Sequence, residues 1–354
     1  MTQPDDCFAP LMRAILRAPE AAPVADLRAF LAATARGETD KREVCALLSV
    51  LSAQPLLPEM AEALVREIEA GAPTGPALSS RGLEAVNIVG TGGGIPSFNI
   101  SSTASIIAAA AGIRVLKSGS TAYTSAAGAV EFLRAAGIAP VRSHAGARDA
   151  LDRFGIAFYM PGDFSPLLKR LAMAAMPRPL KTFAPVLNRI GPFLRMLPAG
   201  GQLTGLSAME DLDWYSEVFR RLGRDNISLV ANMIGLDEGC SFCLNTLLRI
   251  RGGVTRERVI EPAEFGLAGG RPADIAGGDA EANLRLTEAI YAGEAPQVAT
   301  DCALFNAALL IVTGTSGDDL AAAMAAARAA VESGAARALF NRLRSAQQRL
   351  ERAG

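Results

Sequence analysis

The chain has 354 residues, 50% of them hydrophobic and only 20% charged, and its formal net charge is −1. This composition is enough for a large buried core and predicts a globular protein of two or three domains, or of one elaborate domain. The near-neutral charge argues against nucleic acid as a partner, and the apolar stretches look interrupted before the roughly 18 residues that a membrane span needs. The N-terminus is acidic and shows no secretory signal, and the number of cysteines is odd, so we expect a cytoplasmic protein with free thiols. Because the net charge is close to zero, we expect its ligand to be a small molecule.

The first 73 residues predict a small helical domain. Apolar residues recur there every three or four positions, as at Val44, Leu47, Leu48 and Leu51, which is typical of helices with one buried face. A second helical segment at residues 165–183 is expected to return to this domain. The predicted N-terminal helices are residues 8–17, 23–35, 41–52 and 58–70.

Residues 82–164 and 184–354 predict a large α/β domain. Short apolar runs alternate there with helical runs, which is typical of a mainly parallel sheet covered by helices. The predicted strands are residues 85–89, 114–116, 157–160, 201–206 and 227–233. The predicted helices are residues 103–111, 130–136, 214–222, 318–332 and 335–352.

A glycine-rich segment joins strand 85–89 to helix 103–111. Glycines let the backbone take positive φ and approach a ligand closely, and a helix N-terminus provides amide donors for an anion. An ordinary turn is the alternative for a glycine cluster alone, and neither the P-loop nor the dinucleotide-binding pattern fits. Nearby polar side chains nevertheless favour a phosphate-binding cradle. The segment is Gly90, Thr91, Gly92, Gly93 and Gly94, and the polar neighbours are Asn99, Ser101, Ser102, Thr103 and Lys117.

Two adjacent acids, Asp237 and Glu238, follow directly after the strand predicted at 227–233. Open α/β sheets bind ligands at the carboxyl ends of their strands. Mg²⁺ is usually held by one or two carboxylates together with substrate phosphates. A solvated acidic turn is the alternative, but beside a phosphate cradle the two acids predict a magnesium site.

Two other motifs predict no chemistry. Cys240 and Cys243 have the spacing of a zinc knuckle, but no second Cys or His pair completes a tetrahedral site. His144, the only histidine, is predicted to lie on the surface in a polar connection, without a nucleophile motif near it. We therefore assign no residue as a general acid or base.

The order of these motifs resembles the anthranilate phosphoribosyltransferase family, whose fold is shared more distantly with pyrimidine nucleoside phosphorylases. The resemblance spans nearly the whole chain. It is carried by residues 37–40 before helix 41–52, 90–93 with 99–102, Lys117, Gly119, Ser125 and Gly128, 188–192, 236–238, and 277–283 with Asn306.

The resemblance implies transfer of ribose 5-phosphate from phosphoribosyl pyrophosphate to an aromatic amine, by default anthranilate in tryptophan biosynthesis, with Mg²⁺ as cofactor. Such a reaction depends on stabilising the departing pyrophosphate and aligning the reactants more than on acid–base groups. The resemblance also implies a homodimer formed through the N-terminal helices. The donor-binding residues would be Gly90, Thr91, Gly92, Gly93, Asn99, Ser101, Ser102, Lys117, Gly119 and Ser125. The metal would be held by Ser101, Asp237 and Glu238.

The departures from the family pattern gather on the acceptor side. Gly94 replaces the usual aspartate, and Ser118, Ser120 and Thr121 stand where the family has His, Asn and Arg. We assign acceptor binding to Ser118, Ser120 and Lys181, and expect another aromatic or heterocyclic acceptor as the alternative to anthranilate.

The residue that would hold the acceptor carboxylate depends on the alignment, which gives Ala184 without a gap and Lys181 with a three-residue insertion. Lysine lacks the planar, forked guanidinium group with which arginine binds a carboxylate.

Two functions from other classes stay open. One is a catalytically silent paralogue that binds a nucleotide or nucleic acid, and the other is nucleoside phosphorolysis.

Overall fold

The computed structural model describes residues 7–18, 20–72, 85–119, 128–174, 185–267, 269–315 and 317–353, with the side chains of 347–353 left out. The chain divides into two compact units. A helical unit comprises residues 1–74, 161–196 and 213–224, and an α/β unit comprises residues 75–160, 197–212 and 225–354.

The helical unit contains the predicted N-terminal helices, which the structure confirms to within one residue at each end. Asp40 begins the third of them with a capping box, because its carboxylate accepts from the Arg42 amide and its own amide donates to Glu43. The helices of this unit are α1 (Phe8–Arg17), α2 (Val24–Arg36), α3 (Lys41–Ala53), α4 (Pro58–Ala70), α8 (Pro161–Phe164), α9 (Pro166–Ala174), α11 (Pro185–Ile190) and α12 (Leu212–Arg221).

Helices α11 and α12 belong to the helical unit, although the sequence pattern predicts that all of 184–354 lies in the α/β domain. The Trp214 indole donates to the Leu56 carbonyl at 2.7 Å, and its ring packs edge-on against Phe193. The Arg195 amide donates to the Glu69 carboxylate at 2.6 Å. These contacts join residues far apart in sequence, which local periodicity cannot reveal.

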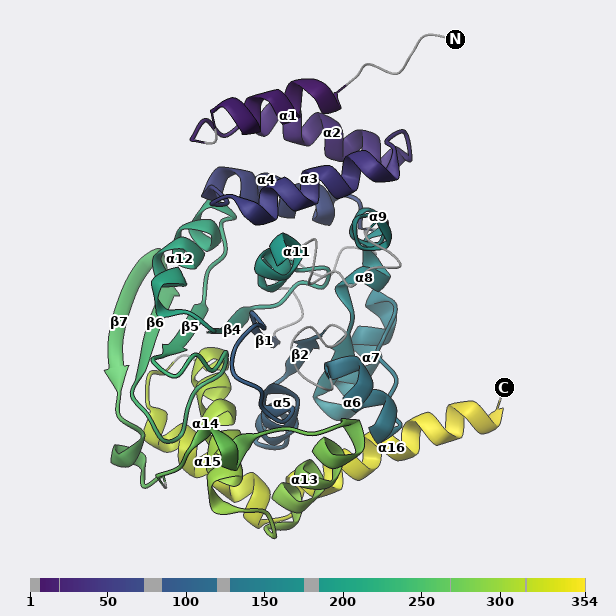
Figure 1. Cartoon of the computed structure of the whole chain (residues 1–354). Helices are drawn as coiled ribbons and strands as arrows, with labels where there is room; N and C mark the ends of the chain where they lie inside the picture. Colours follow the sequence, from purple (N-terminus) through teal and green to yellow (C-terminus); the bar gives the residue numbers. More distant parts are fainter. Residues whose placement is uncertain are drawn as a thin grey trace. The chain divides into compact units, whose positions relative to one another are not determined.

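The α/β unit is built on one seven-stranded sheet with the order β3-β2-β1-β4-β5-β6-β7 (Figure 1). The pairs from β3 to β5 are parallel, and β6 and β7 are antiparallel, which confirms the predicted mainly parallel sheet. The strands are β1 (Val86–Gly90), β2 (Val115–Ser118), β3 (Ile156–Tyr159), β4 (Gly201–Leu206), β5 (Ile227–Asn232), β6 (Asn245–Arg251) and β7 (Val254–Ile260).

Helices α5 and α14 pack against one another, and α14 also contacts β1 and β4 whereas α5 contacts β1 and β2. A Cβ atom at Gly314 of α14 would lie 3.4 Å from the Val86 side chain, so the helix lies directly on the sheet. The helices of this unit are α5 (Ile100–Ala110), α6 (Ala129–Ala136), α7 (His144–Phe154), α13 (Ala280–Ala292), α14 (Gln297–Gly314), α15 (Leu320–Glu332) and α16 (Ala335–Ala353). Short 3-10 turns lie at Gly191–Phe193, Met209–Asp211, Pro262–Phe265 and Pro272–Ile275.

Among the described helices only α14 is long and apolar enough to cross a membrane, and 78% of it is buried in the protein. As expected, a charged residue interrupts this apolar stretch before it reaches 18 residues. Asp301 is the one charge in α14, and it lies buried in the first half of the helix. The apolar composition of α14 is that of a helix surrounded by other elements of the α/β unit.

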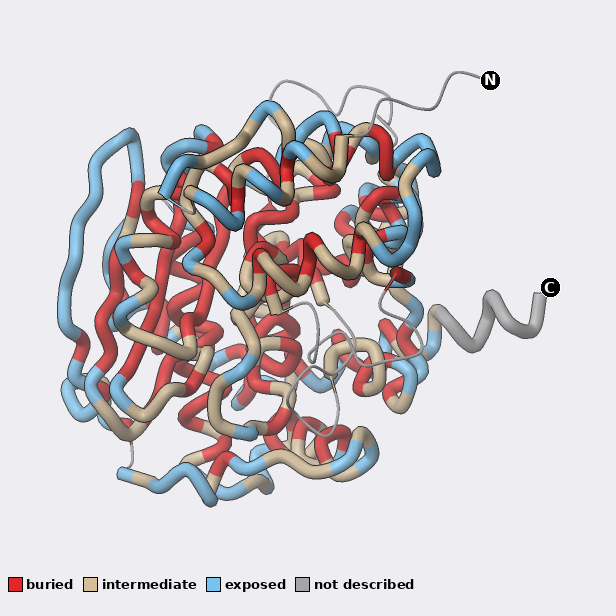
Figure 2. The backbone as a smooth tube through the Cα atoms, turned by 45° about the horizontal axis from the view of Figure 1, so that its top comes forward, coloured by how far each residue is buried: buried red, intermediate tan, exposed pale blue. Residues whose placement is uncertain are grey.

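The β6–β7 hairpin was not predicted. Its two-residue turn is Gly252-Gly253, and both residues have positive φ, as a tight hairpin turn requires. Strand β7 is the free edge of the sheet, and all of it except Ile260 is exposed (Figures 1 and 2). Arg256 and Arg258 place charge on this edge, a common protection against edge-to-edge association.

Candidate active site

The glycine-rich loop lies over the carboxyl ends of β4 and β5. The Thr91 amide donates to the Gly205 carbonyl at 2.9 Å, and the Ile95 amide donates to the Gly235 carbonyl at 3.0 Å. Gly92 and Gly93 have φ values of 69° and 84°. Those values favour glycine, so the loop needs these residues for its shape whatever it binds.

The loop is joined directly to the two predicted metal-binding acids. The Gly92 amide donates to Asp237 Oδ2 at 2.7 Å. The structure therefore brings Gly92 of the predicted cradle and Asp237 of the predicted metal site together. It also shows that one amide of the loop is engaged by a carboxylate of the protein itself.

Three glycines make room for this acidic turn. A Cβ atom at Gly90 would lie 2.3 Å from Asp237 Oδ2, and one at Gly94 would lie 2.4 Å from the Gly235 carbonyl oxygen. At Gly205 the Cβ would lie 1.9 Å from the Asp237 carbonyl oxygen. Gly94 thus has a steric role here, because the acidic turn occupies the space that a larger side chain would need.

A Gly205→Ala substitution is expected to displace the Asp237 backbone and lower the melting temperature by several degrees, since backbone cannot yield as a flexible side chain can. Differential scanning calorimetry tests this. Gly269→Ala is the matched control, because a Cβ at Gly269 meets no atom within 4 Å. Equal melting temperatures for the two variants would contradict the packing argument.

Two buried asparagines hold the acidic turn. The Asn232 amide group donates to the carbonyls of Leu236 and Glu238 at 3.0 and 2.9 Å, and its oxygen accepts from the Leu236 amide at 3.1 Å. Asn306 accepts from the Gly239 amide and donates to the Gly239 carbonyl, both at 2.8 Å. Sequence reasoning gave no role to Asn232, although its place at the end of a predicted strand was a usable signal.

Lys117, the predicted phosphate-binding cation, is buried and donates to the Ser118 carbonyl at 2.7 Å. Burial lowers the pKa of Lys117 to about 8, while the charges of Glu238 and Asp237 oppose that shift. Burial raises the pKa of Asp237 and of Glu238, and for Glu238 the Asp237 charge adds to the rise. The charges of the three groups therefore influence one another's ionisation, although burial has the larger effect on each pKa.

The acids and Ser101 line one narrow gap, together with Gly90 and Asn306, and this gap has no room for a water molecule as it stands. Glu238 Oε2 is buried and has no hydrogen-bond partner among the described residues. Within them, no three His, Cys, Asp or Glu side chains form a metal-binding group. Two carboxylates and one hydroxyl nevertheless fit Mg²⁺, because this ion usually takes its remaining ligands from water and substrate phosphates.

Three further donor residues lie at the N-terminus of α5. Asn99 is the N-cap residue of this helix, Ser101 is partly exposed in its first turn, and Ser102 is buried. The Asn283 amide group donates to Asn99 Oδ1 at 2.9 Å. Asn283 lies in a segment that resembles the family, but no individual role could be assigned to it from the sequence alone.

The acceptor-side residues are placed only in part. Ser118 is buried at the end of β2, and both its amide and its hydroxyl donate to Asn87 Oδ1, at 2.9 and 3.0 Å. A Cβ at Gly119 would lie 2.8 Å from the Ala129 side chain, so close packing explains this glycine. Ser120, Thr121, Ser125, Lys181 and Ala184 lie outside the described residues.

His144 is partly exposed, but it is the first residue of α7, whereas the sequence predicted that it lies in the preceding connection. Ser143 caps that helix by accepting from the Gly146 amide at 3.0 Å.

Cys240 is buried and Cys243 is partly buried. A hydrogen bond from the Cys243 thiol lowers the pKa of Cys240.

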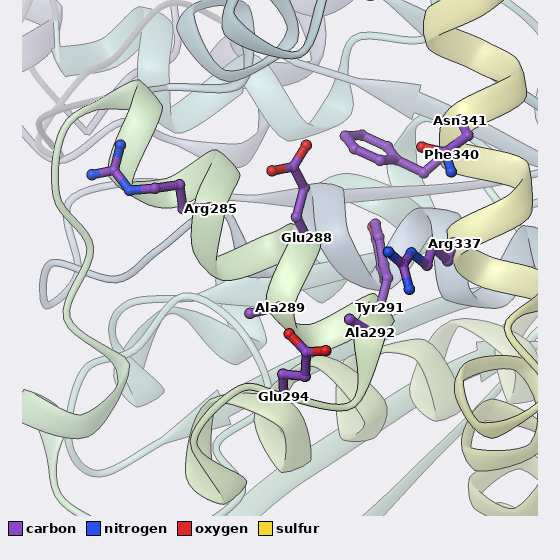
Figure 3. Close-up of a pocket in the computed structure, with 9 residues that line it drawn as sticks. All are labelled: Arg285, Glu288, Ala289, Tyr291, Ala292, Glu294, Arg337, Phe340 and Asn341. Carbon is purple, nitrogen blue, oxygen red and sulfur yellow. The ribbon is translucent and has the colours of Figure 1, made fainter.

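A second cavity, of about 410 Å³, lies between α13 and α16 (Figure 3). Both arginines and acids line it, and Glu288 is already paired with Arg344 at 2.6 Å. None of the predicted site residues lines it.

Residues 82–337 match the model of the glycosyl transferase family, a/b domain. The chain is 31% identical over 311 residues to the anthranilate phosphoribosyltransferase of Geobacillus kaustophilus, covering 87% of this chain and 89% of the relative. It is 32% identical over 268 residues to anthranilate phosphoribosyltransferase 2 of Streptomyces coelicolor, covering 74% of this chain and 77% of that one.

Solved structures agree with the fold. The Thermus thermophilus anthranilate phosphoribosyltransferase superposes with a TM-score of 0.78 at 26% identity, over 97% of this chain and 99% of that one. The Saccharomyces cerevisiae enzyme in complex with PRPP and Mg superposes with a TM-score of 0.83 at 19% identity, over 98% and 99% of the two chains. The chain therefore belongs to the anthranilate phosphoribosyltransferase family, whose members are pentosyltransferases.

Proposed function

We propose that this chain transfers ribose 5-phosphate from phosphoribosyl pyrophosphate (PRPP) to an aromatic amine and depends on Mg²⁺. The observation that carries the proposal is the hydrogen bond from the Gly92 amide of the glycine loop to Asp237, which joins the loop to the acidic turn in a chain of this family. The structures of the yeast relative with PRPP and Mg, and of a variant of it with Mg, lend support.

The roles follow from charge and position. The bond from the anomeric carbon to pyrophosphate breaks, a bond to the amine nitrogen forms, and the amine loses a proton. The Lys117 ammonium and the N-terminal amides of α5 attract the phosphates. Asp237, Glu238 and Ser101 would hold Mg²⁺, which when bound neutralises charge on the departing pyrophosphate. Gly90, Thr91, Gly92, Gly93, Asn99, Ser102, Gly119 and Ser125 complete the proposed donor site.

The proposed acceptor site includes Ser118, Ser120 and Lys181. A backbone N–H can only donate, so the Asn87 atom that faces the Ser118 amide is its oxygen. The Ser118 hydroxyl, which lies beside the same oxygen, must donate to it as well, and it offers only lone pairs to any ligand. A ligand carboxylate needs a hydrogen-bond donor, which the Ser118 hydroxyl cannot provide. The arrangement therefore supports an acceptor whose carboxylate, if it has one, does not bind to Ser118.

Pyrophosphate release against a panel of aromatic amines tests the activity. We expect Mg²⁺-dependent release with at least one amine, and anthranilate is the first to try because the relatives are named for it. Omission of Mg²⁺ with a chelator present is the control. PRPP binding without release for any acceptor would identify a catalytically silent paralogue, and phosphate-dependent release of a base would identify a phosphorylase.

We further propose a cytoplasmic homodimer formed through the N-terminal helices α1 to α4. Light scattering coupled to size exclusion measures its mass. A monomer at micromolar concentration would contradict this assembly.

A further inference from the structure

Residues 236–239, which contain both acids, form a turn without backbone hydrogen bonds of its own. Within the described part of the chain, no amide or carbonyl of this turn bonds to another backbone group. Two buried asparagines, Asn232 and Asn306, bond its backbone groups instead. The conformation of the turn, and with it the direction of the two acids, therefore depends on side chains.

Asn232 bonds the peptide groups on both sides of the acids. Its NH2 group donates to the Leu236 carbonyl, directly before Asp237, and to the Glu238 carbonyl, at 3.0 and 2.9 Å. The Leu236 N–H, which can only donate, faces Asn232 Oδ1 at 3.1 Å, so the nitrogen of the same amide is the atom that faces the two carbonyls. One planar side chain thus spans the segment that carries both carboxylates.

Asn306 has a different part in holding the turn. It accepts from the Gly239 amide and donates to the Gly239 carbonyl, both at 2.8 Å, and so attaches the end of the turn to helix α14. Asn232 lies at the end of β5 and bonds the turn across both acids. We therefore expect Asn306 to anchor the turn and Asn232 to set how the two acids are directed within it.

The two carboxylates need such a restraint because like charges repel one another. Asp237 is restrained by the Gly92 amide, whereas Glu238 Oε2 is buried and has no hydrogen-bond partner among the described residues. A cation shared by two carboxylates offsets their repulsion. It can be shared only where the backbone keeps both side chains directed at the same point.

We propose that Asn232 is a positioning residue for the metal: by bonding the peptide groups before and after the two acids, it keeps both carboxylates directed at one ion. Both N–H bonds of its amide are used by the turn, so it acts through Asp237 and Glu238. The inference rests on the proposed Mg²⁺-dependent binding of PRPP.

Asn232→Ala removes the three hydrogen bonds that this side chain makes with the turn. Calorimetric titration of the full-length protein with PRPP, once with Mg²⁺ and once with a chelator, gives the factor by which Mg²⁺ raises the affinity. We expect this factor to fall by about tenfold to a hundredfold, as is usual when a residue that orients a metal ligand is lost. The affinity measured with the chelator should stay close to that of the wild type, because Asn232 is not part of the proposed phosphate-binding site.

Asn245→Ala is the matched control. Asn245 lies opposite Asn232 in the β5–β6 pair and is also buried. It makes three hydrogen bonds as well, with the Cys240 amide at 2.7 Å, the Cys240 carbonyl at 2.8 Å and the Cys243 carbonyl at 2.9 Å. These bonds hold the next turn, which carries neither acid. Both variants should therefore unfold at a lower temperature than the wild type, while Asn245→Ala keeps the wild-type response to Mg²⁺.

An unchanged response to Mg²⁺ in Asn232→Ala, or an equal loss in both variants, would overturn the inference. A wild type whose PRPP affinity does not depend on Mg²⁺ would instead refute the metal site on which the inference rests. Should the alanine variants not fold, Asn232→Leu and Asn245→Leu remove the same bonds while keeping a side chain of similar size, and they enter the same comparison.

Discussion

Replacing Asp237 by Asn together with Glu238 by Gln is expected to abolish the Mg²⁺ dependence of PRPP binding and to lower kcat by at least about a hundredfold. Both substitutions keep the shape of the side chain and remove its charge. The asparagine introduced in place of Asp237 can still accept from the Gly92 amide with its oxygen, so the glycine loop should keep its contact. Titration with PRPP, with and without Mg²⁺, and pyrophosphate release measure the two effects.

The pH dependence of the free energy of unfolding gives a second readout of the two acids, in the absence of metal. Burial raises the pKa of both acids, so between the ordinary carboxyl pKa and the raised ones the folded chain binds more protons than the unfolded chain. Without metal, their contribution therefore makes the wild type less stable as pH rises through that window. Asn and Gln do not titrate, and this fall should be smaller in the variant.

The matched control is Asp149→Asn with Glu257→Gln, which removes the same charge from exposed positions. It should leave Mg²⁺ dependence and kcat unchanged. A double variant at 237 and 238 that keeps full Mg²⁺ dependence would refute the metal assignment, whatever its stability.

The parts of the site that the sequence could predict are contiguous in the chain. Gly90 to Gly94 and Asp237 with Glu238 are runs whose chemistry is visible without knowledge of the fold. The register β1-β4-β5 brings these runs together, because the carboxyl ends of neighbouring parallel strands meet at one edge of the sheet. A mainly parallel sheet was therefore enough to predict that the loop and the acids meet.

The asparagines that hold the site could not be assigned in this way. Asn232 bonds its own turn, and Asn283 and Asn306 reach across helices to segments more than 60 residues away. A single asparagine in a helix carries no pattern, since its role depends on which backbone donor faces it. The same limit applies to α12, because tertiary contacts such as those of Trp214 with Leu56 and of Tyr215 with Arg189 assign it to the helical unit.

Strand β7 was missed for a different physical reason. It is exposed on both faces, so its sequence lacks the alternation of apolar and polar residues that marks a half-buried strand. The Gly252-Gly253 pair was the available signal, since two glycines between extended runs are typical of a tight hairpin.

Replacing Lys117 by Met is expected to lower kcat/KM for PRPP by about a hundredfold or more, because it removes the buried cation of the proposed donor site. Met has a similar length and suits a buried position, so the fold should tolerate it. Steady-state kinetics with varied PRPP measures the loss. Lys169→Met, at an exposed position of α9, is the control and should keep wild-type kinetics.

The pH dependence identifies the group responsible. Because the pKa of Lys117 is lowered to about 8, its ammonium is present below that pH and is lost above it. PRPP is an anion and favours the charged form, so the affinity of the wild type should fall as pH rises through about 8, while Lys117→Met should show no fall in that range. An equal fall in the variant would assign the titration to another group.

Stability should change in the other direction over the alkaline range. Between pH 8 and the ordinary lysine value of 10.5, the unfolded chain holds the Lys117 proton and the folded chain has released it. The lowered pKa therefore makes the folded chain more stable as pH rises through this window. Urea unfolding at a series of pH values should show this rise in the wild type and a smaller one in Lys117→Met. The two opposite slopes, of affinity and of stability, would then belong to one buried ammonium group.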